Sequence, residues 1–284
     1  MIPVGFEYVR PSTVDEAVTA LGQAGEDAKV LAGGQSLIPV LRLRLAAPTT
    51  LVDLGGCADL VGVREQGDSL VIGAMTTHAD VASNDLVRQH APLVSDAAHS
   101  IGDPQVRHLG TFGGSLSHAD PAGDLPAVAC AMDATMVVVG PNGRREVPAG
   151  EFFSDYLTTA LAPDEVLAEV RLPKLTGWGT RYEKFNRTAQ AWAIVGVAAA
   201  VRRDNSSIAE ARVALTNMGS TPWRANAVEQ ALTGADASPD ALAAACAHAA
   251  EGTSPADDIT GSAEYRRHLA TVLTRRAVGK AAGL

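Results

Sequence analysis

Two glycine pairs, each followed by a polar residue, are the features of this 284-residue chain that are best suited to chemistry. The first lies in Ala32-Gly33-Gly34-Gln35-Ser36 and the second in Thr111-Phe112-Gly113-Gly114-Ser115. Glycine lets the backbone adopt positive φ and approach a ligand closely, so that successive N–H groups can converge on a phosphate. A helix that begins directly after such a loop adds its partial positive charge. One such turn is usually structural, but two from distant segments predict a cleft for a phosphate-bearing cofactor whose identity these residues leave open.

A short acidic stretch follows the second glycine segment. His118, Asp120 and Asp124 place one imidazole and two carboxylates within seven residues. Zinc and iron sites use such ligands, but this spacing matches no standard set, and Pro121 prevents a shared helical face. We therefore expect these side chains to cap the loop or to accept hydrogen bonds from a ligand hydroxyl.

Other nucleotide-binding and catalytic motifs do not fit the chain. No Gly-Lys pair is followed by Ser or Thr, which excludes the Walker pattern for ATP. The only Gly-x-Gly, Gly177-Trp178-Gly179, runs on into Thr180, Arg181 and Tyr182, where a Rossmann fingerprint needs a third Gly or Ala. No Gly-x-Ser-x-Gly motif is present, so nothing favours a serine hydrolase.

Composition narrows the possible functions further. A formal net charge of −9 disfavours general nucleic-acid binding, because such binding relies on Lys and Arg to neutralise phosphates. The three cysteines, Cys57, Cys130 and Cys246, are too few and too widely spaced for an iron–sulfur cluster, and we expect them to be reduced and buried. No basic start leads into an apolar stretch and no apolar run reaches membrane-spanning length, so we expect a soluble, unexported protein.

Both glycine pairs must be positioned by regular elements. The spacing of Ser12, Thr13 and Glu16 predicts a capped amphipathic helix, and a short strand over 28–32 should end at the first glycine pair, with a helical turn after it. The segment 78–101 has helical periodicity and delivers the chain into the second glycine segment. Turn signals and β-rich runs predict further strands over 50–54, 60–64, 69–73, 135–139, 144–147 and 165–172.

A second unit is predicted after the segment 174–179. Strand-like runs over 181–186, 193–202 and 208–216 form a meander, and the last two are joined by a polar turn at Asp204-Asn205-Ser206. Helices should follow over 224–232, 239–250 and 263–280. A meander followed by helices is typical of a compact α+β domain.

Together with their neighbours, the glycine segments resemble a family signature. Ala32–Pro39, and Thr111–Ser115 followed by His118-Ala119-Asp120-Pro121, are similar to the signature of the xanthine dehydrogenase flavoprotein family, the FAD-binding subunits of molybdenum hydroxylases. The similarity extends over almost the whole chain and includes Gly73–Thr77 and Gly261–Arg267. Within that family the pattern most resembles the medium subunits of aerobic carbon monoxide dehydrogenases.

This resemblance implies an α+β chain of two domains. Residues 1–176 would form a two-part FAD-binding domain of the vanillyl-alcohol-oxidase-like (PCMH-type) fold. Residues 177–284 would form the small α+β C-terminal domain, a three-stranded meander plus helices.

The resemblance also implies which residues hold FAD. The two glycine segments would contact the pyrophosphate and neighbouring groups, chiefly through backbone donors. Asp124 would accept hydrogen bonds from FAD, Leu167 would lie beside the flavin and Lys184 near its polar edge. The residues implied are Ala32, Gly33, Gly34, Gln35, Ser36, Thr111, Gly113, Gly114, Ser115, Asp124, Leu167 and Lys184.

Three positions depart from the family pattern. Relatives commonly have Ile at the position of Phe112, Asn at that of Ser115, and His, Asn or Thr at that of Gln35. Binding through the backbone tolerates such changes, whereas the shorter Ser115 side chain has less reach than an Asn amide.

By resemblance, the chain is one component of a larger oxidoreductase. The substrate would be oxidised at a molybdenum cofactor, with copper in a carbon monoxide dehydrogenase, on a large subunit. Electrons would pass through [2Fe–2S] clusters on a small subunit to FAD on this chain, and then to a quinone or another acceptor. The absence here of cluster cysteines and of an acid–base set is consistent with such a relay, because the flavin carries the redox chemistry.

The implied assembly is a dimer of heterotrimers in the cytoplasm, either free or peripheral at the inner face of the membrane. The alternatives are a flavoprotein subunit of a xanthine, aldehyde or heterocycle dehydrogenase, a stand-alone flavoenzyme, and a non-catalytic nucleotide-binding module.

Overall fold

A small parallel sheet near the N-terminus carries the first glycine segment in the computed structural model, which describes residues 1–284. Its strand order is β1 (Glu7–Val9), β3 (Thr50–Asp53), β2 (Ala28–Leu31). Helix α1 (Val14–Ala24) packs on this sheet, with Thr13 as N-cap, as the sequence predicted. Strand β2 ends directly before the first glycine segment, which begins at Ala32, and α2 (Leu37–Arg42) follows that segment.

A five-stranded antiparallel sheet forms the centre of the N-terminal part. Its order is β4-β5-β10-β6-β7. The strands span Val63–Gln66 (β4), Ser69–Gly73 (β5), Val166–Pro173 (β10), Thr135–Gly140 (β6) and Gly143–Pro148 (β7). A short helix, α9 (Ala149–Phe152), and the hairpin of β8 (Phe153–Asp155) and β9 (Thr158–Thr159) connect β7 to β10.

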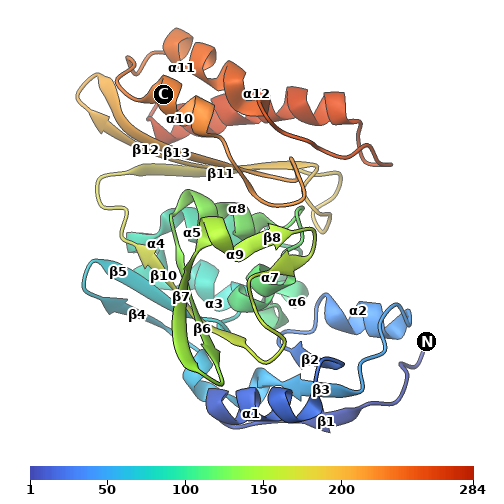
Figure 1. Cartoon of the computed structure of the whole chain (residues 1–284). Coiled ribbons are helices and arrows are strands. Elements are labelled where there is room, and N and C mark those ends of the chain that lie inside the picture. The colour runs from blue at the N-terminus through green and yellow to red at the C-terminus, as the bar shows by residue number, and fades with distance from the viewer.

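Six short helices lie between this central sheet and the C-terminal sheet (Figure 1). They are α3 (His78–Ser83), α4 (Asp85–His90), α5 (Pro92–His99), α6 (Pro104–Leu109), α7 (Phe112–His118) and α8 (Asp124–Ala131). Sheet residues such as Ile72 and Val170 share a core of 36 buried residues with helical ones such as Leu93, Leu116 and Val128. The predicted helical stretch over 78–101 is thus divided into three helices, because Asn84 caps α4 and Pro92 begins α5.

The C-terminal part is a meander covered by helices on one face. Its strand order is β11 (Gly179–Phe185), β12 (Val195–Asp204), β13 (Ser207–Thr216), β14 (Trp223–Arg224). The helices are α10 (Asn226–Leu232), α11 (Pro239–Cys246) and α12 (Ala263–Ala281). The three predicted long strands are confirmed, and the two-residue β14 is an addition to them.

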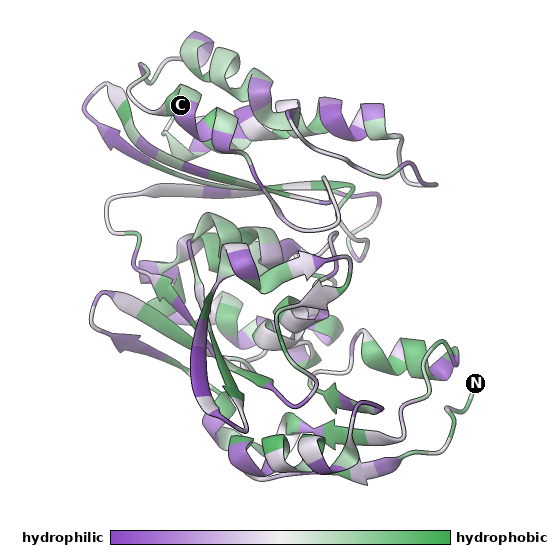
Figure 2. Ribbon diagram, viewed as in Figure 1, coloured by the Kyte–Doolittle hydropathy of each residue, from purple (hydrophilic) through white to green (hydrophobic).

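Strand β12 is buried on both faces, and this joins the two parts of the chain. Ala198 and Ala200 belong to the core shared with the N-terminal helices, whereas Val197 and Val201 belong to the core under α12. Alternation along a strand explains the division, because successive side chains point to opposite faces. Figure 2 shows much apolar colour on the ribbon of the helices on both sides of this sheet. None of the helices combines the length and the apolar character needed to cross a membrane.

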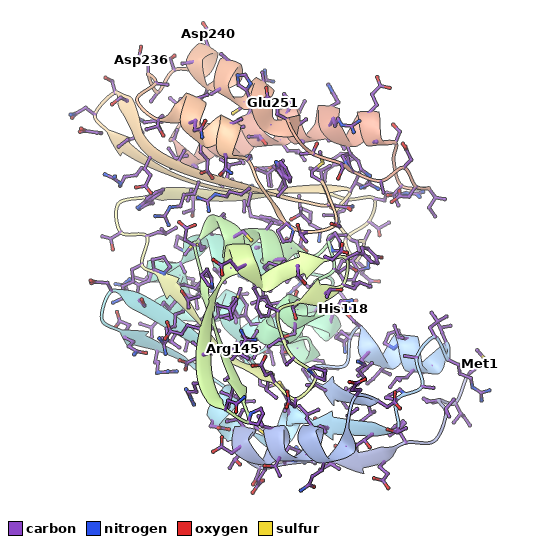
Figure 3. All side chains as sticks on the ribbon, in the orientation of Figure 1. Met1, His118, Arg145, Asp236, Asp240 and Glu251 are labelled. Carbon is purple, nitrogen blue, oxygen red and sulfur yellow. The ribbon has the colours of Figure 1, made fainter.

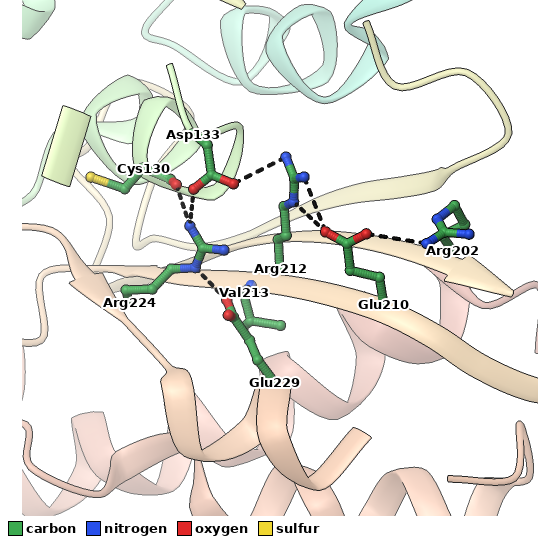
Figure 4. A network of polar contacts seen from close by, with 8 residues as sticks. All are labelled: Cys130, Asp133, Arg202, Glu210, Arg212, Val213, Arg224 and Glu229. Atoms are coloured by element: carbon green, nitrogen blue, oxygen red, sulfur yellow. Dashed lines mark hydrogen bonds and ion pairs between the residues drawn. The ribbon is translucent and has the colours of Figure 1, made fainter. Parts of the chain in front are cut away.

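A network of charged residues also fastens the two parts together (Figure 4). Asp133, two residues after the end of α8, forms ion pairs with Arg224 at 2.6 Å and Arg212 at 3.1 Å, both from the C-terminal sheet. Arg224 also donates to the carbonyl oxygen of Cys130 at 2.7 Å and pairs with Glu229. Asp133 has a φ of 50°, a left-handed conformation that Asp and Asn tolerate better than most residues.

Replacing Asp133 by asparagine should lower the free energy of unfolding by about 1–2 kcal/mol. The substitution keeps a side chain suited to positive φ but removes the charge that faces two arginines. The expected loss is moderate because the Asp133 side chain is 52% exposed and solvent screens the pair. Urea unfolding measures it, with Glu26→Gln as the control at an exposed acid. An equal stability of both variants would show that the Asp133 network contributes nothing.

Candidate cofactor site

The two glycine segments lie against each other. A Cβ added at Gly33 would lie 2.1 Å from the carbonyl oxygen of Leu109 and 2.7 Å from the Cα of Gly110. A Cβ added at Gly114 would lie 3.4 Å from the Cβ of Ala32. Gly33 is therefore required by the contact between the segments, since any side chain there would push them apart. The structure thus brings the two distant segments together, and their role as one cofactor site stays a prediction.

The first segment presents unused backbone donors. The backbone amides of Gly33, Gly34, Gln35 and Ser36 donate to no group in the structure. Gly34 has a φ of 73°, which curves the backbone so that these amides can converge. Buried or half-buried N–H groups without partners are costly, and an anion would satisfy them. This segment fits the pyrophosphate that the family resemblance implies.

The second segment is not the open loop that the sequence predicted. Its glycines lie in the first turn of α7, where the Thr111 hydroxyl accepts the Gly114 amide at 3.2 Å. The amide of Gly113 donates to Ala74 at 2.8 Å, and that of Ser115 to Thr111 at 3.1 Å. The expectation of free backbone donors here was wrong, because helix capping and the end of β5 already satisfy them. The Ser115 hydroxyl makes no hydrogen bond in the structure and remains available as a donor.

Gly113 has a packing role instead. A Cβ at this position would lie 2.4 Å from the Cβ of Ala74, just after β5. The absence of a side chain lets α7 approach the central sheet closely, and this places Ser115 at the half-buried start of the helix.

Asp124 and Lys184, which the family resemblance assigned separately to the cofactor, contact each other. The Lys184 ammonium is 2.7 Å from Asp124 Oδ2 and also donates to the Ser100 carbonyl at 3.2 Å. The Tyr182 hydroxyl donates to Asp124 Oδ1 at 2.6 Å. All three side chains are buried or nearly so, which makes this a charged cluster between α8 and β11.

Burial shapes the protonation of this cluster. It raises the pKa of the Asp124 carboxyl, and the Lys184 ammonium and the Tyr182 hydroxyl oppose that effect. The pKa of Tyr182 is raised well above its ordinary value, first by burial and then by the Asp124 carboxylate, so the phenol stays a donor. Sequence reasoning missed Tyr182. The available signal was its spacing, because Tyr182 and Lys184 are two residues apart on a predicted strand and their side chains therefore point to the same face.

A groove of about 400 Å³ opens beside this cluster. Its walls include Ser100 at the end of α5, Lys184 on β11, and Asn186 in the connection to β12. Lys184 therefore lies where a polar ligand edge could reach it between the two parts of the chain.

Leu167 lies within the large core on β10. It is 3% exposed and belongs to the same apolar cluster as Ala74, Phe112 and Leu116. The pairing of β10 with β6 shifts register between Leu167 and Glu169. Leu167 thus backs the start of α7 from the side of the sheet.

The acidic stretch after α7 caps its own loop. The Asp120 carboxylate accepts the Ala122 amide at 2.8 Å, as expected for this stretch. His118 Nε2 is 3.9 Å from Asp120 Oδ2, and Asp124 belongs instead to the buried cluster described above. Figure 3 labels His118 near α7, on the side of the chain that carries α2.

Two further residues support the site without having been predicted. His78 is buried, its Nδ1 has no partner, and a Cβ at Gly110 would lie 2.9 Å from its Cδ2. Burial and then Arg107 lower the pKa of His78 to about 4, so the imidazole is neutral at pH 7. The His78 ring packs against Gly110, the residue whose backbone lies against Gly33.

Asn217 connects the two parts of the chain at the loop after α7. Its backbone N–H donates to the Pro121 carbonyl at 2.7 Å, and its side-chain amide donates to the Ala193 carbonyl at 2.8 Å. Asn217 has a φ of 63°, a conformation in which asparagine is favoured. The connection between β11 and β12, which lines the groove, is held in place from this side.

Known proteins share this organisation over the whole chain. Residues 4–175 match the family described as the FAD binding domain in molybdopterin dehydrogenase, and residues 180–281 match the CO dehydrogenase flavoprotein C-terminal domain. The carbon monoxide dehydrogenase medium chain of Hydrogenophaga pseudoflava is 42% identical over 284 residues, covering 99% of this chain and 98% of its own.

Solved structures agree with the sequence matches. A chain of carbon monoxide dehydrogenase from Hydrogenophaga pseudoflava superimposes with a TM-score of 0.97 at 44% identity, covering 99% of this chain and 98% of its own. A chain of quinoline 2-oxidoreductase from Pseudomonas putida 86 superimposes with a TM-score of 0.95 at 32% identity, covering 100% and 99%. The predicted α+β fold and the predicted family are confirmed. This chain belongs to the family of FAD-binding medium subunits of molybdopterin dehydrogenases.

Proposed function

We propose that this chain is the electron-exit subunit of an aerobic carbon monoxide dehydrogenase. The observation that carries the proposal is the match along both parts of the chain to carbon monoxide dehydrogenase medium chains. When bound, FAD supplies the redox chemistry, accepting electrons from a partner subunit and releasing them to an external acceptor. The chain itself binds, orients and shields this group.

In this proposal the first glycine segment holds the pyrophosphate. The unbonded amides of Gly33–Ser36 donate to its oxygens, while Ala32 lines the contact with the second segment. Thr111, Gly113 and Gly114 shape the opposite wall as the start of α7, and Ser115 contributes its hydroxyl. Contacts with charged acceptors are each worth about 1.5–3 kcal/mol, so four aligned amides supply a large share of the affinity.

The remaining predicted residues serve the flavin end. Lys184 reaches the polar edge of the ring from the groove, and Asp124 orients that ammonium through the ion pair while accepting a hydrogen bond from FAD. Leu167 forms part of the apolar backing behind α7. We also place the domain boundary between residues 176 and 177, which is supported by the end of β10 at Pro173 and the start of β11 at Gly179.

The relatives that match over nearly their full length are named as medium chains, which supports small and large partner subunits. We propose that the small subunit carries [2Fe–2S] clusters and the large one the molybdenum cofactor with copper. We further propose a dimer of heterotrimers, in the cytoplasm or peripheral at the inner membrane face, that passes electrons to a quinone.

A dehydrogenase acting on an aldehyde or a heterocycle is the second candidate. The likeness to a chain of quinoline 2-oxidoreductase favours this candidate. Subunits of this kind can serve different substrates, because the substrate would be selected on the large subunit.

Copurification from the source organism tests the function. We expect the complex to contain copper as well as molybdenum and its flavin absorbance to bleach with CO, while the isolated chain with FAD stays oxidised under CO. Molybdenum without copper, with bleaching by an aldehyde or heterocycle, would identify the second candidate. Bleaching of the isolated chain by CO alone would contradict a relay role.

A further inference from the structure

The Tyr182 side chain combines an apolar ring with a buried polar tip. The ring belongs to the large core that both parts of the chain share, and the residue is only 5% exposed. A phenylalanine ring would fill the same space, so packing does not explain the hydroxyl. Burying a hydroxyl costs free energy unless it finds a partner. Its partner is Asp124 Oδ1 at 2.6 Å, which points to a role in holding that carboxylate.

The strand next to β11 leaves room for this hydroxyl. Gly196 on β12 pairs with Lys184, and a Cβ added at Gly196 would lie 2.5 Å from the Tyr182 hydroxyl oxygen. The same Cβ would lie 3.0 Å from the Cβ of Thr216 on β13. Any side chain at position 196 would therefore push the hydroxyl out of its place. The absence of one lets the hydroxyl reach Asp124.

Each oxygen of the Asp124 carboxylate has its own partner. Oδ1 accepts the Tyr182 hydroxyl, and Oδ2 lies 2.7 Å from the Lys184 ammonium. The phenol ring is rigid, whereas the ammonium is carried on a flexible four-carbon stem. Because Tyr182 occupies Oδ1, Oδ2 is left for Lys184, which also donates to the Ser100 carbonyl at the groove. The hydroxyl thus fixes the orientation of the carboxylate and, through it, the place of the ammonium.

Lys184 is the ionic partner of Asp124, and other charged side chains near α8 have partners elsewhere. The elements packed against α8 include α5, α7, β13 and β14. Their charged groups lie in other contacts: Arg212 and Arg224 pair with Asp133, Asp96 lies near Arg181 and His99, and His118 lies 3.9 Å from Asp120. The arrangement at the groove therefore depends on the contacts among Asp124, Tyr182 and Lys184.

We propose that Tyr182 is a positioning residue for the flavin, whose hydroxyl orients the Asp124 carboxylate so that the Lys184 ammonium stands at the edge of the groove. The inference rests on the proposed function, in which Lys184 reaches the polar edge of the ring. A positive charge held there favours the reduced form of FAD, because reduction adds electron density to the ring. Tyr182 thereby raises the redox potential of bound FAD through Asp124 and Lys184.

Replacing Tyr182 by phenylalanine tests this role in the full chain loaded with FAD. Without the hydroxyl, both carboxylate oxygens turn to the ammonium and draw it away from the groove. We expect reduced FAD to bind about tenfold less tightly relative to oxidised FAD, which corresponds to a midpoint potential lower by about 30 mV for a two-electron couple. Equilibrium titration against a reference dye measures the potential. Tyr156→Phe, which removes the hydroxyl of an exposed tyrosine, is the control and should leave the potential unchanged.

The pH dependence separates positioning from a loss of packing. Burial raises the pKa of the Asp124 carboxyl, and Lys184 and then the Tyr182 hydrogen bond lower it, so the carboxyl of the variant should take up its proton at a higher pH. A protonated Asp124 no longer attracts the ammonium. The difference in potential between Tyr182→Phe and the unmodified chain should therefore be largest at alkaline pH and become smaller as pH falls. A difference that stays constant with pH would indicate a merely structural effect and overturn the inference.

Gly196→Ala provides an independent test. The added methyl group displaces the hydroxyl while the tyrosine remains, so the potential should again fall. Adding Gly196→Ala to Tyr182→Phe should lower the potential no further, because the hydroxyl is already gone. Fully additive shifts would show that Gly196 does not act through Tyr182 and would count against the inference.

The possible failures are distinguishable. An unchanged or raised potential in Tyr182→Phe, with FAD bound at the normal content, would overturn the role of Tyr182 alone. An unmodified chain that binds no FAD would contradict the proposed function itself.

Discussion

Replacing Gly33 by alanine is expected to weaken FAD binding by at least about 100-fold. The added Cβ would lie 2.1 Å from the Leu109 carbonyl oxygen, a distance that backbone atoms cannot accept without moving. The shift would misalign the unbonded amides of Gly33–Ser36. Loss of two hydrogen bonds to a charged phosphate costs about 3–6 kcal/mol, and each 1.4 kcal/mol is a factor of ten in affinity.

Quenching of flavin fluorescence during titration of the apoprotein measures this effect. Gly22→Ala is the matched control, because a Cβ at that position in α1 meets nothing within 4 Å. Circular dichroism should show that both variants fold. Unchanged affinity in Gly33→Ala would mean that the first segment does not hold the cofactor.

Replacing Lys184 by methionine should lower the free energy of unfolding of the apoprotein by about 3–5 kcal/mol. Both members of the pair with Asp124 are buried, with side-chain exposures of 8% and 5%, so the substitution leaves a carboxylate without its counter-charge in a poorly solvated place. The Tyr182 hydroxyl alone compensates only part of this cost.

A double-mutant cycle isolates the contribution of the pair. Asp124→Asn together with Lys184→Met should be more stable than Lys184→Met alone, because no unpaired charge remains. The loss in free energy of unfolding caused by Lys184→Met should also become smaller as pH falls. Burial raises the pKa of Asp124 in the folded state, so protonation favours folding below that pKa, and the penalty grows as pH rises through it. An additive cycle with no pH dependence would contradict a buried ion pair.

Local signals predicted most of the elements. The Thr13 cap and Glu16 set the start of α1, and the alternating and apolar runs of β12 and β13 predicted the meander. The first glycine segment was predicted in its place between a strand and a helix, because strand β2, the turn and α2 are consecutive in the chain, and its binding of a phosphate stays a prediction.

The rest depends on contacts between distant segments. The amide of Gly113 donates to the Ala74 carbonyl, which the local sequence does not reveal, so the second segment was mistaken for a loop with free donors. Asp124 and Lys184 are 60 residues apart, and only the packing of β11 beside α8 brings them together with Tyr182. The roles of His78 and Asn217 are likewise invisible without the fold.

The most direct measurement is the flavin content and absorbance spectrum of the unmodified purified chain after incubation with FAD and gel filtration. We predict one FAD per chain, and its retention should be lost in Gly33→Ala but kept in Gly22→Ala. A chain that emerges without flavin, or that retains it equally in both variants, would contradict a cofactor site built on the first glycine segment.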